Sequence, residues 1–223
     1  MTGDASAGPA SGPVIGLLLA AGFGRRFDPD GRRDKLLAEA GGARVATRAA
    51  RSLAGACDRV IAVVRPGASA LRDALVAGGV SGIVECPDAH LGMGHSLARG
   101  AEAAAALRPR RLVVALADMP WIEPATIRAL VAQADAREGR EVSASGDAGG
   151  RARWIVVPAY RGQRGHPVVF GAAHLAALGR CTGDRGAAAL LSEYPVARIA
   201  VEDAGVIRDV DEPADLFRES DED

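Results

Sequence analysis

The chain has 223 residues, of which 48% are hydrophobic and 25% are charged, and its formal net charge is −1. This balance is typical of a soluble globular protein, and the length accommodates a sizeable core. The near-neutral charge gives no extended electrostatic footprint for a nucleic acid, and no apolar stretch of the sequence approaches the roughly 20 residues that span a bilayer. We therefore expect neither a nucleic-acid nor a membrane partner.

The amino-terminal residues and the cysteines bear on domain organisation and location. Residues 1–12 are mostly small and lack the basic and apolar regions of a secretory signal, so they predict a disordered tail before a single domain over residues 13–223. The three cysteines are odd in number and far apart, which disfavours a disulfide framework and a zinc cluster. We therefore expect a cytoplasmic protein.

Short apolar runs alternate with amphipathic stretches through the first 138 residues. The apolar runs predict strands at residues 14–20, 59–64, 82–86 and 111–117. Helical spacing of apolar residues predicts helices at residues 46–56, 70–79, 93–107 and 123–138. Because strands alternate with helices, we expect a mostly parallel sheet with helices on both faces.

The pattern changes after residue 138. Residues 139–153 are polar and rich in glycine, which predicts a loop. Strands are then expected at 154–160 and 166–171, short helices at 172–178 and 186–194, a closing pair of strands at 197–201 and 205–210, and a final helix at 212–220. The sequence has no internal repeat, so we interpret this half as an elaboration of the same sheet.

A glycine-rich loop, Leu-Ala-Ala-Gly-Phe-Gly-Arg-Arg, follows the first predicted strand at residues 19–26. Glycines let the backbone approach a ligand closely, and successive N–H groups form an anion-binding nest. The dinucleotide fingerprint G-x-G-x-x-G fails because its third position is Phe27, and no Gly-Lys-Ser/Thr of a P-loop follows. We interpret the loop as a phosphate site; a tight turn with solvated arginines is the alternative.

Lys35 is the only lysine among the 27 lysine and arginine residues of the chain. Lysine is a compact point charge on a flexible stem, whereas arginine is a planar fork. A compact charge suits the tight space around a folded triphosphate, so we expect Lys35 to hold phosphate together with Arg25 and Arg26. The alternative is that one lysine escaped an arginine-rich composition.

Aspartates lie where two of the predicted strands end. Asp118 follows the strand 111–117, and Asp209 and Asp211 share one side of the strand end near residue 210. Ligands of open α/β sheets bind outside the carboxyl ends of the strands, and Mg²⁺ prefers carboxylates, phosphates and waters. We expect Asp118 and Asp211 to bind the metal and Asp209 to cap the final helix. For Asp118, a turn or cap role is the alternative.

Three more segments are candidates for substrate binding. Residues 92–96, Gly-Met-Gly-His-Ser, begin a predicted helix and offer free N–H groups to a base, ribose or phosphate; an ordinary helix N-terminus is the alternative. The charged glycine loops at 164–167 and 183–186 suit a second, anionic substrate. His166 precedes a proline, which holds it extended and can aim its imidazole into a cleft.

Taken in this order, the motifs resemble those of the molybdenum cofactor cytidylyltransferases in the MobA-like NTP transferase superfamily. LAAGFGRRF…DK resembles the signature loop, ADMP the metal aspartate motif and LGMGHSL the base-binding segment. RGHPVVF, GDRGA and DVDEPAD resemble features of the cytidylyltransferase branch. The resemblance extends from residue 14 to residue 217. It departs from the family in a longer loop before Lys35 and in DMP where DQP is usual.

The resemblance implies a Rossmann-like, three-layer α/β nucleotidyltransferase fold and Mg²⁺, with Mn²⁺ as an alternative. Ala20-Ala21 matches the LAAG form of the loop, which is associated with CTP, whereas LAGG is associated with GTP. The implied reaction transfers CMP to the phosphate of molybdopterin and releases pyrophosphate, and a molybdenum hydroxylase is the implied recipient of the product. The implied site comprises Arg25, Lys35 and Asp118 as catalytic residues, Leu19, Ala20, Ala21, Gly22, Gly24, Gly92, Met93 and Ser96 around the nucleotide, Arg164, His166 and Asp184 around the acceptor, and Asp118 and Asp211 on the metal.

Three rival functions stay open at this point. An NAD(P)- or flavin-dependent oxidoreductase shares the fold class, but NAD enzymes carry an acidic residue about 20 residues beyond the loop. Here the second predicted strand is followed by Arg65 and Pro66, which disfavours NAD and suits only NADP. A glycosyltransferase uses a D-x-D metal motif, which this chain has only near its end. A non-catalytic molybdenum cofactor carrier binds molybdopterin without releasing pyrophosphate.

Overall fold

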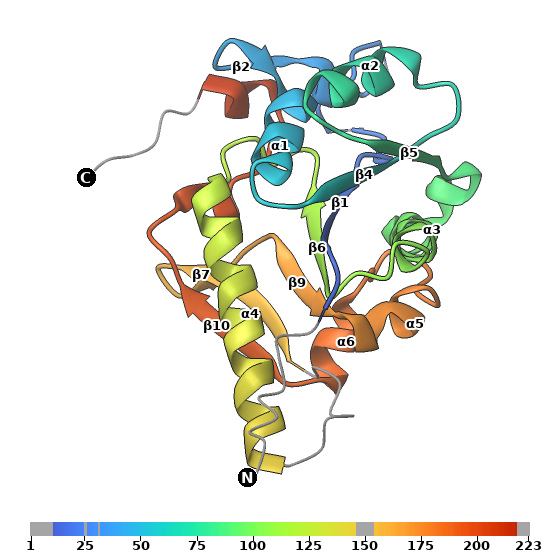
Figure 1. Cartoon of the computed structure of the whole chain (residues 1–223). Helices are drawn as coiled ribbons and strands as arrows, with labels where there is room; N and C mark the ends of the chain where they lie inside the picture. The colour runs from blue at the N-terminus through green and yellow to red at the C-terminus, as the bar shows by residue number, and fades with distance from the viewer. Residues whose placement is uncertain (1–10, 25, 31, 146–153, 218–223) are drawn as a thin grey trace, which may run out of the picture.

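An eight-stranded sheet forms the centre of the computed structural model, which describes residues 11–24, 26–30, 32–145 and 154–217 (Figure 1). Seven strands follow the order β10-β7-β9-β6-β1-β4-β5, and β8 pairs with β7. These strands are β1 (Val14–Leu19), β4 (Arg59–Val64), β5 (Gly82–Glu85), β6 (Arg111–Leu116), β7 (Ile155–Tyr160), β8 (Gln163–Arg164), β9 (Val168–Gly171) and β10 (Val196–Ala200). A separate hairpin joins β2 (Glu39–Ala40) to β3 (Ala43–Arg44).

Most of the strands in the sheet run in one direction. The central strand β1 is parallel to β4 and to β6, β4 is parallel to β5, and β10 is parallel to β7. The strand β9 is inserted between β6 and β7 and is antiparallel to both. The expectation of a mostly parallel sheet is therefore confirmed, with one reversed strand in its interior.

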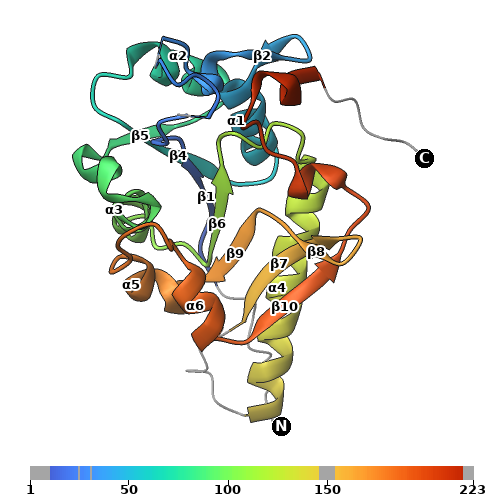
Figure 2. The ribbon, with the colours of Figure 1, turned by 180° about the vertical axis from the view of Figure 1, so that it is seen from behind.

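Helices cover both faces of the sheet, which gives three layers (Figures 1 and 2). One apolar core joins the sheet to α1 (Val45–Ala54), α2 (Ser69–Ala77) and α4 (Pro124–Ser145). The other core joins the opposite face to α3 (Met93–Ala105), α5 (Leu175–Leu178) and α6 (Ala188–Glu193). Within the described residues, none of these helices has the length and apolarity that a bilayer span requires.

The alternation of side chains along β1 divides its residues between the two cores. Val14 and Leu18 pack into the core with α1, whereas Ile15, Leu17 and Leu19 pack into the core with α3. All of them are buried, as the continuous apolar run predicted. In the first half of the chain, the element ends before α4 agree with the prediction to within two residues.

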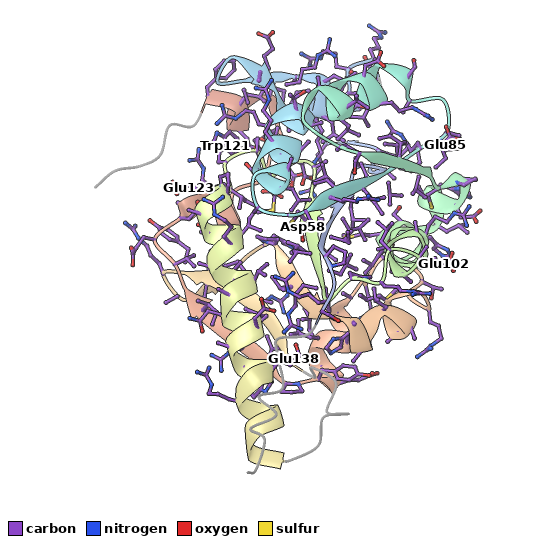
Figure 3. The ribbon with its side chains drawn as sticks, in the orientation of Figure 1. Asp58, Glu85, Glu102, Trp121, Glu123 and Glu138 are labelled. Carbon is purple, nitrogen blue, oxygen red and sulfur yellow. The ribbon has the colours of Figure 1, made fainter. Side chains whose placement is uncertain are left out.

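Helix α4 extends beyond its predicted end at residue 138 and continues to Ser145, so the loop predicted at 139–153 is wrong over its first part. A single interior glycine costs a helix only about 1 kcal/mol. The fully buried Arg111 fixes the turn of α4 that precedes this extension to β6, because Nε donates to Asp135 Oδ1 at 2.9 Å and Nη2 donates to Glu138. Figure 3 shows Glu138 between α4 and the end of the sheet.

The closing strand pair and the final helix also differ from the prediction. Residues 197–201 correspond to β10, but the second strand is replaced by a 3₁₀ helix, η4 (Ala204–Ile207), because Asp203 Oδ1 accepts from Gly205 N at 2.8 Å and turns the chain. The final helix is a short 3₁₀ turn, η5 (Pro213–Phe217). Its cap is Asp215 rather than Asp209, since Asp215 Oδ2 accepts from Glu212 N at 2.8 Å.

Candidate active site

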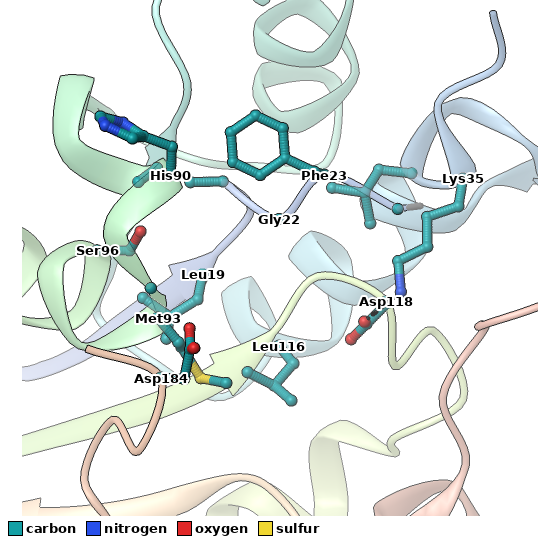
Figure 4. A pocket seen from close by; sticks show the side chains of 15 residues that line it. Leu19, Gly22, Phe23, Lys35, His90, Met93, Ser96, Leu116, Asp118 and Asp184 are labelled. Carbon is teal, nitrogen blue, oxygen red and sulfur yellow. Dashed lines mark hydrogen bonds and ion pairs between the residues drawn. The ribbon is translucent and has the colours of Figure 1, made fainter. Parts of the chain in front are cut away.

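A cavity of about 470 Å³ opens at the carboxyl edge of β1 and β6, where ligands of open α/β sheets bind. Its volume is typical of a small-molecule site. Its lining consists of Leu19, Ala21, Gly22, Phe23, Gly24, Lys35, Leu36, Ala89, His90, Gly92, Met93, Ser96, Leu116, Asp118 and Asp184 (Figure 4). The predicted glycine loop, the helix entrance at 92–96 and the predicted metal aspartate thus surround one space.

The glycine loop is held open toward this cavity by Arg65, which follows β4. Arg65 Nη1 donates to Gly22 O at 2.8 Å, Nη2 donates to Asp34 Oδ2 at 3.1 Å, and the guanidinium lies 4.9 Å from the centroid of the Phe23 ring. Asp34 in turn caps the 3₁₀ helix η1 (Lys35–Leu37), accepting from Leu36 N at 3.0 Å. Arg65 therefore connects the loop to the segment that carries Lys35.

Lys35 reaches the cavity because a glycine lies beside its stem. Gly24 has a positive φ of +60°, and a Cβ at this position would lie 3.4 Å from Lys35 Cγ. The longer loop before Lys35 is closed by Asp28, whose carboxylate accepts from Asp30 N at 3.3 Å and from Arg33 N at 2.6 Å. The insertion therefore forms its own turn, and Lys35 reaches Asp118 in spite of it.

Lys35 lies between two carboxylates that are distant in sequence. Its Nζ donates to Asp118 Oδ2 at 2.7 Å and to Asp211 Oδ1 at 3.1 Å, and the residue is only 9% exposed. Burial opposes the charged amine, but the charges and hydrogen bonds of Asp118 and Asp211 outweigh it and raise the pKa of Lys35. Asp211 is brought here because Val210 N donates to Asp118 O at 2.8 Å.

The two carboxylates fit a hard divalent cation. Asp118 Oδ1 is buried and has no hydrogen-bond partner among the described residues, so one carboxylate oxygen is left for a further ligand. The described part of the chain contains no group of three or more His, Cys, Asp or Glu side chains arranged around a metal position. Two carboxylates suffice for Mg²⁺, which usually takes one or two from the protein and completes its shell with phosphates and waters.

Asp209, the third acidic residue of this region, adds to its negative potential. Partial desolvation of the Asp209 carboxyl, with repulsion from Asp211 and Asp118, raises its pKa. The cationic side of the region includes Arg26, whose Nη1 lies 2.6 Å from Asp211 Oδ2. Arg25 lies outside the described residues, so its predicted role is not placed in this geometry.

The wall opposite the glycine loop is made where the start of α3 meets residues 182–184. Gly94 N donates to Gly183 O at 2.7 Å, and a Cβ on Gly94 would lie 2.5 Å from Thr182 C. Only glycine permits this approach of two backbones. Met93, Ser96 and Asp184 line the cavity from this wall.

Replacement of Gly92 by alanine is expected to distort this wall. Gly92 has φ +122°, and a Cβ would lie 2.4 Å from Gly183 C and 2.6 Å from Asp184 Oδ1. We expect a loss of about 1–3 kcal/mol in the free energy of unfolding and roughly a tenfold weaker nucleotide affinity, a cost of about 1.4 kcal/mol. Gly67→Ala is the matched control, because Gly67 has φ +75° with open space around it. Denaturant unfolding and nucleotide titration of both variants measure the difference, and equal affinities would contradict the prediction.

The predicted acceptor residues are distributed over two places. Asp184 lines the cavity with the nucleotide residues, whereas Arg164 is exposed on β8. His166 lies near Asp118: its Nδ1 is buried without a hydrogen-bond partner in the described part of the chain. Burial lowers the pKa of His166, and the Asp118 charge opposes this shift. His166 is therefore a neutral imidazole beside the carboxylates at neutral pH.

The prediction for Ala20 as a nucleotide contact needs correction. Leu19 and Ala21 line the cavity, but Ala20 alternates to the other face, where it is 1% exposed within the core that contains α1. Its backbone N–H donates to Val63 O at 2.9 Å and extends the pairing of β1 with β4. The side chain of Ala20 is therefore part of the packing behind the loop.

Several residues of the site escaped the sequence prediction. Leu36, Ala89, His90 and Leu116 all line the cavity, as does the side chain of Phe23, for which only the backbone of the predicted loop was considered. Each lies within a few residues of a predicted site motif, and that proximity was the available signal. The sequence also contains a signal for Arg65, because this residue immediately follows a strand whose carboxyl end is at the ligand-binding edge.

The sequence matches the family described as MobA-like NTP transferase domain over residues 16–199. Among solved structures, the chain is similar to Rv0371c from Mycobacterium tuberculosis H37Rv at 27% identity with a TM-score of 0.72, over 92% of this chain and 96% of that chain. It is also similar to Mth528, a nucleotidyl transferase from Methanothermobacter, at 21% identity with a TM-score of 0.72, over 92% and 95% of the two chains. No curated protein shows a significant match.

A further structural relative is CMP:2-keto-3-deoxy-manno-octonic acid synthetase complexed with CTP, at 12% identity with a TM-score of 0.59, over 91% of this chain and 95% of that chain. At that identity the likeness concerns the fold alone. The family match covers most of the chain and includes the loop, the aspartate and the helix entrance that form the cavity. The chain belongs to the MobA-like NTP transferase family, and it is a nucleotidyltransferase.

Proposed function

We propose that the enzyme transfers CMP from CTP to the phosphate of a molybdopterin-type acceptor and releases pyrophosphate. An acceptor phosphate oxygen forms a bond to the α-phosphorus of CTP, the bond from that phosphorus to the bridging oxygen breaks, and pyrophosphate leaves with the electron pair. The observation that supports this most directly is the placement of Lys35 between Asp118 and Asp211 at the edge of a nucleotide-sized cavity. No protein nucleophile is required, because positioning and charge stabilisation supply the catalysis.

Asp118 and Asp211 are the residues proposed to hold Mg²⁺. When bound, the cation supplies charge neutralisation for the triphosphate and the incoming phosphate. Mn²⁺ is an alternative, supported by a structure of Rv0371c described as a complex with manganese, at 27% identity to this chain. The unpartnered Oδ1 of Asp118 and the acidic neighbourhood of Asp211 favour either ion.

The remaining roles are proposed for residues of the predicted site motifs, several of which line the cavity. N–H groups of residues 21–24, with Lys35 and Arg25, hold the phosphates, and Lys35 stabilises negative charge that develops on pyrophosphate. Ser96 and Met93 contact the base and ribose from the α3 wall. Asp184 orients the acceptor from that same wall, while His166 and Arg164 approach from the β7–β9 connection. A molybdenum hydroxylase is the proposed recipient of the product.

CTP is proposed as the nucleotide because Ala20-Ala21 matches the LAAG form of the signature loop. A glycine at position 21 would add backbone freedom at the point where the loop leaves the sheet, whereas Ala21 is 3% exposed and fills this corner of the cavity.

The test is pyrophosphate release from each of the four ribonucleoside triphosphates, with and without molybdopterin. We expect release only when the acceptor is present, with CTP preferred over GTP by at least about tenfold in kcat/KM, or 1.4 kcal/mol. Equal use of CTP and GTP would contradict the nucleotide assignment. Release that does not depend on molybdopterin would contradict the acceptor, and molybdopterin binding without any release would identify a carrier.

A further inference from the structure

Two basic side chains already occupy the carboxylates that are proposed to hold the divalent cation. Lys35 Nζ lies 2.7 Å from Asp118 Oδ2 and 3.1 Å from Asp211 Oδ1. Arg26 Nη1 lies 2.6 Å from Asp211 Oδ2, which engages the second oxygen of that carboxylate. Of the four oxygens of the pair, only Asp118 Oδ1 therefore has no hydrogen-bonding or ion-pair contact within the described residues.

An ammonium and a divalent cation compete for this position. A metal ion needs direct contact with carboxylate oxygens at about 2.1 Å, but Lys35 Nζ donates to one oxygen of each carboxylate in the pair. Lys35 also neutralises much of the negative charge that attracts the metal. The side chain of Lys35 is 11% exposed and that of Asp118 is 22% exposed, so water screens this competition only partly.

Lys35 has a second partner available when a nucleotide enters. It lines the same cavity as Gly22 (Figure 4). Its stem runs beside Gly24 on the glycine loop. Lysine has a flexible four-carbon stem and three donors. A triphosphate held by the loop therefore lies within the space that the Lys35 side chain can reach without movement of the backbone.

We propose that Lys35 is a displaceable internal cation: it neutralises Asp118 and Asp211 while the nucleotide is absent, and it moves to the triphosphate when metal and nucleotide enter together. Metal and nucleotide then bind cooperatively, because each stabilises the arrangement that the other requires. The inference rests on the proposed function only in requiring a triphosphate and a divalent cation, and it does not depend on the identity of the base.

The exchange predicts a gain of metal affinity when Lys35 is removed. In Lys35→Met the two carboxylates lose their buried counter-ion, and the metal no longer has to displace it. We expect Mn²⁺ to bind this variant at least about tenfold more tightly than it binds the wild-type enzyme in the absence of nucleotide, within the usual 5–150-fold range of site coupling. Arg26 is 77% exposed, so Arg26→Met is expected to give only about a threefold gain.

The experiment is a titration of Mn²⁺ into nucleotide-free enzyme, with free Mn²⁺ read from its electron paramagnetic resonance signal. Arg110→Met is the matched control: Arg110 also pairs with a carboxylate, Asp135, at 3.4 Å, but it lies at the amino end of β6, a strand length of roughly 20 Å from Asp118. We expect its Mn²⁺ affinity to equal that of the wild type. The double variant Lys35→Met/Asp118→Asn is expected to lose the gain.

A second titration with tripolyphosphate, which has no base, measures the other half of the exchange. Wild-type enzyme is expected to bind Mn²⁺ more tightly in the presence of tripolyphosphate than in its absence, and this gain is expected to be larger than the gain that Lys35→Met shows.

Equal nucleotide-free Mn²⁺ affinities for wild type, Lys35→Met and Arg26→Met would overturn the exchange even if CTP-dependent pyrophosphate release is intact. A tenfold gain together with failure of the CTP preference would support the exchange and overturn only the proposed substrate. If Lys35→Met does not fold, Lys35→Gln removes the same charge with a polar side chain and is titrated in its place.

Discussion

Replacement of Asp118 by asparagine is expected to lower turnover by about 10³-fold, because cation stabilisation of a phosphoryl-transfer transition state is worth several kcal/mol. Asparagine has nearly the same size and keeps an oxygen that can accept from Lys35 Nζ, which now donates to Asp118 at 2.7 Å. The charge that is proposed to attract the metal is lost. Steady-state pyrophosphate release at saturating nucleotide measures the effect, and activity near that of the wild type would contradict the assignment of Asp118.

The stability of the Asp118→Asn variant separates loss of catalysis from loss of the fold. We expect its free energy of unfolding to fall by only about 1–3 kcal/mol, the usual cost of weakening a hydrogen bond to a buried charged group. Asp73→Asn is the matched control, because Asp73 is exposed on α2 and away from the cavity lining. Its activity should stay within about twofold of the wild type, as expected for surface substitutions.

Replacement of Lys35 by glutamine is expected to lower kcat by about 10²–10³-fold, as the loss of one preorganised donor does in other enzymes. Glutamine keeps a polar, hydrogen-bonding side chain that is one bond shorter, but it provides no charge for the pyrophosphate that is proposed to leave. The lower kcat of Lys35→Gln is more informative when metal binding is measured as well, because the same loss of charge is expected to strengthen Mn²⁺ binding. A slower enzyme that binds Mn²⁺ more tightly cannot be explained by a general collapse of the site.

Lys35→Arg distinguishes the charge of this side chain from its shape. Arginine retains the positive charge, but its planar guanidinium is larger than an ammonium and the space around residue 35 is nearly closed, at 9% exposure. We expect Lys35→Arg to recover less than about one tenth of wild-type kcat, a deficit of 1.4 kcal/mol or more in activation free energy. Full recovery, measured under the conditions used for Lys35→Gln, would show that charge alone is sufficient.

The parts of the fold that were predicted correctly are those whose local pattern and tertiary environment agree. The strand at Arg59–Val64 was predicted with its observed ends, because an apolar run is stopped by Pro66 and Gly67. The end of α4 was missed because Gly139 and the polar residues after it were interpreted as a loop, whereas α4 continues through this glycine to Ser145. Residues 205–210 were predicted as a strand from alternation alone, and the Asp203 cap produces η4 instead.

The candidate site was predicted best where chemistry depends on residue type. Lys35 was predicted because it is the only lysine of the sequence, and Asp118 because it is a carboxylate at the end of a strand. In the structure Lys35 Nζ donates to Asp118 Oδ2. Arg65 acts through Gly22 and Asp34, which are 43 and 31 positions away, and no local pattern reveals such contacts. NAD enzymes carry an acidic residue for the ribose at the end of the second strand. In this chain Arg65 follows that strand, β4, and its side chain supports the glycine loop instead.

The reversal of β9 determines which part of the chain approaches Asp118 from beside the parallel strands. In the parallel strands, residues that follow the strand reach the ligand edge, but β9 runs the other way, so the residues that precede it do so. Its register pairs Val168 with Val114, so the residues that precede Val168, including His166, lie toward the edge of the sheet that carries Asp118. The β7–β9 connection therefore reaches this edge from the opposite chain direction, so its length and composition can change without altering the ends of β1 and β6 that line the cavity.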